Sequence, residues 1–280
     1  MSQQTMSKQK DMELSLITNS VLDNLGFSKK QIMLRSLCIG ERFKFIPSFS
    51  GFTALIAGSS GEGVPLADSD IDIMNILRDV ICVDTGFDNH GELIILGTDY
   101  SETAPGYTRV VSISIPDNLL FSPLFHAISV YDTVSRENFL SSEKMRFFTG
   151  HNRILLNVHQ RNDIKTDING PSVTLTYSPS LHSDFVDSIY FYGGNYLQKW
   201  ENRIKINAWP SSEIVNEVSE MEGYIVPIGD KQSDMQSLEW RICYTTAEKK
   251  LVSSLSDIQI KAYVLLKMCE AGGRRVKLAA

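Results

Sequence analysis

The chain has 280 residues, of which 42% are hydrophobic, enough to bury a substantial core in one large or two closely packed domains. No apolar run reaches membrane-spanning length and the polar N-terminus does not resemble a signal peptide, so we expect a cytoplasmic protein with no membrane partner. The formal net charge of −6 does not indicate general nucleic-acid binding, although it is compatible with a local basic strip.

The cysteines are few and widely separated. Cys38, Cys82, Cys243 and Cys269 form no C-x-x-C pair. This spacing is typical of reduced thiols in a cytosolic core, and it argues against both a disulfide framework and a zinc site.

The N-terminal segment has a helical pattern. Apolar side chains recur at helical spacing over residues 11–25, and a second helix is expected over residues 29–39, ending at Gly40. Cationic residues gather in and just after this second helix: Lys29, Lys30, Arg35, Arg42 and Lys44. A solvated helix face explains most of them, and a nucleic-acid-binding surface is the alternative.

A small turn follows the first strand-like run. The apolar residues 53–57 lead into Gly58-Ser59-Ser60-Gly61, which we expect to be a flexible turn. Backbone N–H groups and a serine hydroxyl in such a turn are well suited to bind phosphate.

Two carboxylates stand a short distance further on. In a strand, Asp70 and Asp72 would project from one face while Ile71 and Ile73 point to the core. Like charges on one face favour a divalent cation with oxygen ligands, such as Mg²⁺. Each half of the pattern is common in unrelated proteins, but a phosphate-binding turn beside paired carboxylates is typical of nucleotidyl transfer.

The remaining elements alternate between sheet and helix. Residues 117–168 are mixed and partly helical, and the Gly170-Pro171 pair interrupts the chain. Strands are expected over residues 73–83, 93–96, 109–115, 173–177 and 184–192, and an apolar helix over residues 259–270.

Gly58-Ser59 followed by Asp70-x-Asp72 resembles the active-site pattern of the nucleotidyltransferase superfamily of DNA polymerase beta and poly(A) polymerase. The fuller string, GSSGEG with SDIDIM, resembles the cGAS-like receptor (Mab-domain) branch. The family's order and spacing continue in five further segments: Trp200-x-x-Arg203, Ala208-Trp209-Pro210, 224–229, 238–243 and Ala247-Glu248-Lys249. The resemblance covers residues 50–270, roughly.

Members of the superfamily use a third carboxylate on a neighbouring strand, and Asp184 and Asp187 are the candidates. Three residues apart on a strand, they face opposite ways. Asp187 shares its face with Phe185, Ile189 and Phe191, which is typical of a core face. We therefore choose Asp184.

The resemblance implies an α+β, bilobal nucleotidyltransferase fold, with a mixed β-sheet N-terminal lobe and a helical C-terminal lobe. On this basis residues 1–48 form a helical spine, 49–195 the core with the sheet, and 196–280 the C-terminal lobe. The lobe is expected to be incomplete, because the sequence ends soon after the last predicted helix and its final residues resemble an expression-vector remnant.

The site residues carry over by position. Asp70, Asp72 and Asp184 match the metal-binding, catalytic acids, and the implied cofactor is Mg²⁺, with Mn²⁺ as a substitute. Nucleotide contacts are implied for a second set: Gly58, Ser59, Arg241, Thr245, Glu248 and Lys267.

The implied activity is synthesis of a cyclic dinucleotide from ATP and GTP, or other nucleoside triphosphates, in an innate immune receptor. The zinc-binding insertion of vertebrate relatives has no counterpart between Arg241 and Lys267. We therefore expect no zinc, and double-stranded RNA rather than DNA as the activator, bound by Lys29, Lys30 and the nearby cations. One alternative is a catalytically inactive Mab-type binding or scaffold domain. Another, on the same core, is polymerisation of linear nucleotides or transfer to RNA ends.

Overall fold

The structure is a computed structural model that describes residues 3–44, 51–66, 69–84, 92–117, 122–160, 164–178, 181–204 and 209–278. Two helices open the chain, α1 (Gln3–Asn24) and α2 (Lys29–Lys44). The later helices are α3 (Gly58–Glu62), α4 (Pro123–Ile128), α5 (Ser142–Gln160), α6 (Tyr196–Glu201), α7 (Ser212–Ser219), α8 (Thr245–Ser254) and α9 (Asp257–Leu278).

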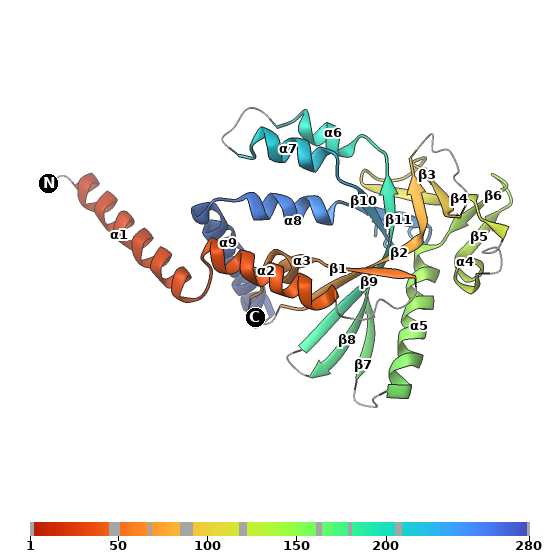
Figure 1. Cartoon of the computed structure of the whole chain (residues 1–280), viewed down its shortest axis with the longest axis horizontal. Coiled ribbons are helices and arrows are strands. Elements are labelled where there is room, and N and C mark those ends of the chain that lie inside the picture. Colours follow the sequence, from red (N-terminus) through yellow and green to blue (C-terminus); the bar gives the residue numbers. More distant parts are fainter. Residues whose placement is uncertain are drawn as a thin grey trace.

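The strands join into one mixed sheet, shown in Figure 1. The first of them are β1 (Phe52–Ile56), β2 (Ile71–Val83), β3 (Ile94–Asp99), β4 (Tyr107–Ser114), β5 (Ser129–Asp132) and β6 (Glu137–Leu140). The later strands are β7 (Lys165–Asn169), β8 (Ser172–Ser178), β9 (Leu181–Tyr192), β10 (Gly223–Val226) and β11 (Glu239–Cys243).

The sheet closes on itself through strand β2. Its hydrogen-bonded path runs from β2 through β3, β4, β11 and β10 to β9, and β9 pairs again with β2. The β2–β9 pairing is parallel and joins segments more than a hundred residues apart in sequence. This closure brings Asp72 and Asp184 together.

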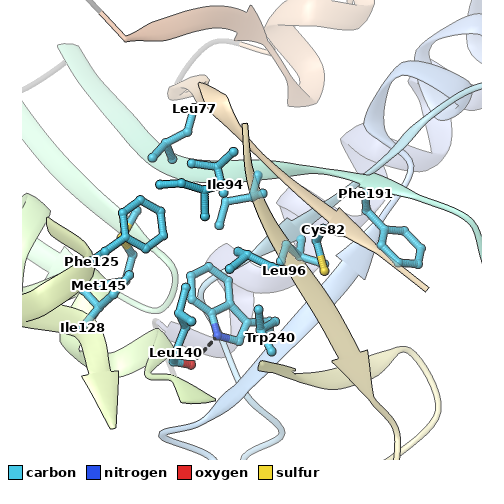
Figure 2. Packing of buried hydrophobic residues seen from close by; sticks show 14 residues of the cluster. Leu77, Cys82, Ile94, Leu96, Phe125, Ile128, Leu140, Met145, Phe191 and Trp240 are labelled. Atoms are coloured by element: carbon cyan, nitrogen blue, oxygen red, sulfur yellow. Dashed lines mark hydrogen bonds between the residues drawn. The ribbon is translucent and has the colours of Figure 1, made fainter. Parts of the chain in front are cut away.

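The main hydrophobic core is lined by strands of this ring (Figure 2). Trp240 of this cluster is fully buried, and its indole N–H donates a 2.8 Å hydrogen bond to the carbonyl of Leu140. Side chains of α4 and α5, such as Phe125 and Met145, cover one side of the cluster. Burying a tryptophan with its N–H satisfied combines a large apolar surface with no unpaired donor.

A second cluster joins helices from the two ends of the chain. Leu22 of α1, Ile32 of α2 and Ile260 of α9 are buried against one another. Beside them, the nearly buried Lys261 forms ion pairs of 2.7 Å with Asp23 and Asp257, so that α9 is fixed to the C-terminal end of α1. The rest of α1 projects away from the body of the molecule in Figure 1.

The expected α+β class with a mixed sheet is confirmed. Several details differ. Helix α2 continues through Gly40, the expected turn at Gly58 is the start of α3, and Asp70 lies just before β2 rather than in it. The sheet also crosses the expected boundary at residue 195, because β10 and β11 belong to it.

The helices in the described part of the chain include none with the length and apolar character needed to cross a lipid bilayer.

Candidate active site

Two carboxylates occupy equivalent positions on neighbouring strands. Asp72 of β2 and Asp184 of β9 are register partners in the parallel pair. Side chains at paired positions of parallel strands point to the same face, so both carboxylates lie on one side of the sheet. On the far side of Asp184, the hydroxyl of Thr174 donates a 2.6 Å hydrogen bond to its Oδ1 atom, which orients this carboxylate.

The Asp72 carboxyl lies in a region of excess negative charge. Its pKa is raised, first by burial and then by the charges of Asp184 and Asp70, while the ammonium of Lys267 acts in the opposite direction. Burial and the two neighbouring carboxylates both disfavour the ionised form of this group, and the charge of Lys267 offsets them only in part. The group is therefore suited to bind a cation.

Gly58 lies directly against this carboxylate. A Cβ atom built on Gly58 would stand 2.0 Å from Oδ2 of Asp72, closer than any real contact, and its φ of 57° is in the left-handed region. Only glycine combines this backbone angle with this contact. The Gly-Ser start of α3 thus lies directly beside the Asp72 carboxylate.

The carboxylates offer the oxygen ligands that Mg²⁺ prefers, but they do not by themselves form a complete coordination shell. Across the described residues, no group of three or more His, Cys, Asp or Glu side chains is arranged to hold a metal ion. Mg²⁺ commonly binds proteins through one or two carboxylates and keeps water or substrate phosphate as its other ligands. Asp72 and Asp184, with the exposed Asp70 just outside the strand, match that kind of donor set.

Helices α3 and α9 form a second wall of the site. The ammonium of Lys267 lies 3.0 Å from Oγ of Ser59 and 2.7 Å from Oε2 of Glu62. Tyr263 donates a 2.9 Å hydrogen bond from its hydroxyl to the same Glu62 oxygen. Two nucleotide-site residues expected from the sequence, Ser59 and Lys267, are therefore in direct contact although 208 positions separate them.

Strand β11 and helix α8 supply the other expected nucleotide contacts. Thr245 is the first residue of α8, which packs against α3. The pKa of Glu248 is raised by burial and by the negative charge of Glu62, and lowered by Arg241. Glu248 is therefore within electrostatic range of both Glu62 and Arg241.

Asp187, the rejected candidate for the third acid, has a different environment. It is 5% exposed, and its Oδ1 accepts a 2.8 Å hydrogen bond from the amide of Asn75, its register partner on β2. Its strand neighbours on the same face, Ile189 and Phe191, belong to the main core. The structure therefore places Asp187 in the core and Asp184 next to Asp72.

The cations expected on α2 do not share one environment. Arg35 packs over the ring of Phe27, and its Nε donates a 3.0 Å hydrogen bond to the carbonyl of Gly63. The side chain of Lys30 is exposed, whereas Lys29 is partly buried and its backbone N–H binds Asp257. The side chains of Arg42 and Lys44 lie outside the described residues.

Sequence reasoning missed two members of this site, Glu62 and Tyr263. Tyr263 precedes Lys267 by four residues, so that one face of a helix carries both. Glu62 follows Gly58 by the same interval, but a Gly-rich string does not predict a helix. Of the two residues, only Tyr263 could thus have been found from the sequence, by its Tyr-x-x-x-Lys spacing to Lys267.

A mixed sheet with paired carboxylates on neighbouring strands, beside a Gly-Ser helix start, defines a nucleotidyltransferase-type fold. Residues 99–254 match the family model of the Mab-21 protein nucleotidyltransferase domain. This is more than half of the chain, which therefore belongs to that family, the one that includes the cGAS-like proteins. The matched range includes Asp184, Arg241 and Glu248 but not Gly58, Asp72 or Lys267. A search of curated proteins gave no significant match.

Proposed function

We propose that this protein is a Mg²⁺-dependent nucleotidyltransferase that joins two nucleoside triphosphates, such as ATP and GTP, into a cyclic dinucleotide. The observation that carries the proposal is the in-register pair Asp72 and Asp184, which stands beside a wall that carries Ser59 and Lys267. Membership of a nucleotidyltransferase family supports the reaction class.

In this proposal the wall formed by α3 and α9, called the helical wall below, binds the triphosphate. The hydroxyl of Ser59 and the ammonium of Lys267 are both donors to phosphate oxygens, and their contact gives a phosphate group a single place to bind. Positioning the triphosphate against a second nucleotide accounts for most of the rate enhancement in transfers of this kind.

Strands β2 and β9, which we call the strand wall of the site, would hold the metal. Asp72 and Asp184, together with Asp70, would be the ligands of Mg²⁺, or of Mn²⁺ in its place. The bound ion would supply charge neutralisation at the triphosphate and a lowered pKa of the attacking ribose hydroxyl. Asp184 is already oriented for this role by Thr174.

The base and ribose groups would lie toward β11 and α8. Arg241 there offers a guanidinium, Thr245 a hydroxyl and Glu248 a carboxyl group whose pKa is raised. Such donors and acceptors can distinguish the edges of bases. This part of the site would therefore select the two nucleotides.

The proposal includes activation by double-stranded RNA in an innate immune role. Phosphate contacts are independent of base sequence, and the exposed Lys30 with Lys29 at the start of α2 is the candidate surface. Arg35 contributes less, because it is used in the contact with Gly63.

An inactive binding domain is the second candidate. It is favoured by the pairing of Lys267 with Glu62, which leaves this ammonium already neutralised.

The test is incubation with labelled ATP, GTP, CTP and UTP, in Mg²⁺ or Mn²⁺, with and without double-stranded RNA or DNA, followed by mass spectrometry of the products. We expect a cyclic dinucleotide that resists phosphatase. Nucleotide binding without any product, under every metal and activator, would favour the inactive domain. A linear product would show transfer without cyclisation.

A further inference from the structure

The Lys267 ammonium is held from three directions. Glu62 accepts from it at 2.7 Å, Ser59 lies at 3.0 Å, and the ring of Tyr263 lies 4.7 Å from Nζ. A lysine side chain has several rotatable bonds, and it occupies a single position only where contacts of this kind restrain it.

Glu62 is the centre of this arrangement. Its Oε2 atom accepts from both Lys267 and the Tyr263 hydroxyl, and its side chain is only 15% exposed. A charge-assisted hydrogen bond in a partly buried place is stronger and better defined than an exposed ion pair. Glu62 also belongs to α3, the helix that presents Ser59.

We propose that Glu62 is a positioning residue of the triphosphate site: it fixes the Lys267 ammonium at the Ser59 hydroxyl, and Tyr263 in turn fixes Glu62. The proposal rests on the function proposed above, because it assigns Lys267 and Ser59 to the triphosphate. An arriving phosphate oxygen replaces the contact between Ser59 and Lys267, while Glu62 keeps the ammonium in place.

This assignment predicts a kinetic signature. Glu62→Gln removes the charge that holds Lys267 but leaves the ammonium free to attract phosphate. Ground-state affinity is then retained, whereas positioning is lost, and a displacement of about 1 Å can reduce a rate a hundredfold. We expect kcat to fall by about 10- to 100-fold with KM changed less than about twofold.

Tyr263→Phe keeps the ring over Lys267 and removes only the hydroxyl. We expect a smaller fall in kcat, about fivefold, in line with the loss of one hydrogen bond. Because Tyr263 acts through Glu62, the double variant should be no slower than Glu62→Gln alone. Independent structural damage would instead multiply the two effects.

The matched control is Glu217→Gln. Glu217 pairs with Lys250 at 2.6 Å, as Glu62 does with Lys267, but this pair is on the surface between α7 and α8. Glu217→Gln should leave kcat and KM unchanged. Thermal unfolding of every variant then separates a loss of positioning from a loss of folding.

A second readout does not depend on activity. The rate at which acetic anhydride acylates Lys267, followed by peptide mass spectrometry, should rise severalfold in Glu62→Gln and stay unchanged in Glu217→Gln. Added ATP with Mg²⁺ should protect Lys267 in the parent protein.

The outcomes separate the two claims. Equal acylation of Lys267 in the parent and in Glu62→Gln, or an unchanged kcat, overturns the positioning role while the proposed function stands. Increased acylation in Glu62→Gln, with neither ATP protection nor product in the parent protein, overturns the proposed function and with it the role in a triphosphate site.

Discussion

The two walls of the site differ in how their charges are compensated. On the strand wall, Asp72 has two carboxylates for neighbours, and its pKa is raised by burial and by their charge. On the helical wall, the Lys267 ammonium has a carboxylate and a hydroxyl as direct partners. The strand wall therefore carries excess negative charge, whereas on the helical wall the positive charge of Lys267 is neutralised by Glu62.

This difference shows which parts of the site depend on a ligand. Uncompensated like charges reduce the stability of the folded state, so the strand wall gains most from a bound cation. The helical wall is already ordered by its own contacts, so a bound cation adds little to its stability. The predictions below test this contrast, from the largest expected effect to the smallest.

The largest effect is expected from the strand wall. Replacing Asp70 and Asp72 together with Asn should reduce product formation by about a hundred- to a thousandfold, the effect of losing a main electrostatic group. Without metal at neutral pH the variant should be as stable as the parent or more stable, because repulsion with Asp184 is relieved. Product analysis and thermal unfolding measure both quantities.

Asp11, exposed on α1, provides the control: Asp11→Asn should change neither activity nor stability. Parental activity in the variant without Asp70 and Asp72 would contradict the assignment of the metal-binding acids.

The third acid gives the next test. Asp184→Asn should abolish activity with little change in stability. Asp187→Asn should stay active but lose about 1–3 kcal/mol of unfolding free energy, because Asp187 is buried and hydrogen-bonded to Asn75. Urea unfolding and product assays on both variants measure the contrast. The opposite pattern would exchange the roles of the two acids.

The pH dependence of stability should report Asp72. Because its native pKa is raised, the native state holds the proton more tightly than the unfolded chain. Its contribution to the unfolding free energy therefore decreases as pH rises from the ordinary carboxyl value, about 3.9, through the raised native pKa. In EDTA, the Tm of Asp72→Asn minus the Tm of the parent protein should increase as the pH rises through that interval.

Added Mg²⁺ should then reduce the Tm difference between Asp72→Asn and the parent protein, by stabilising the parent. A ligand present at a hundred times its Kd stabilises the native state by about 2.7 kcal/mol. The parent should gain Tm on addition of Mg²⁺ at neutral pH and Asp72→Asn should not. Equal gains in both would place the metal elsewhere.

The smallest effect is expected outside both walls, on α2. Reversing the charge of Lys29 and Lys30 to Glu should weaken activation by double-stranded RNA by less than about tenfold and reduce its salt dependence. The matched control reverses Lys8 and Lys10, exposed lysines of α1. Activity that is independent of RNA across a salt titration would exclude RNA as the activator.

Local patterns in the sequence predicted most strands of the site. The run from residue 73 to 83, the break at Gly170-Pro171 and the strand through Asp184 all correspond to elements of the structure. The faces of Asp184 and Asp187 also followed from alternation alone, because a strand has a fixed period of two.

The sequence did not predict what depends on distant contacts. Closure of the sheet through β2 and β9 is set by tertiary packing and leaves no local periodicity. Helix α3 contains two glycines and has low intrinsic helix propensity. It is held from outside, where Ser36 of α2 donates a 2.7 Å hydrogen bond to the carbonyl of Gly61. Arg35 likewise looked like a surface cation in the sequence. Its contacts with Gly63 and Phe27 depend on the same packing of α2 against α3.

The packing around α3 has an evolutionary consequence. A Cβ at Gly61 would lie 2.3 Å from the carbonyl oxygen of Ile56, and one at Gly63 would lie 2.2 Å from that of Ile32. Backbone yields to such contacts less easily than a flexible side chain does, so replacing either glycine should destabilise the fold whether or not the domain has activity. A descendant that lost its carboxylates would still keep this part of the signature. When relatives are sorted into enzymes and non-enzymes, the informative positions are therefore the acids and Lys267, not the glycines.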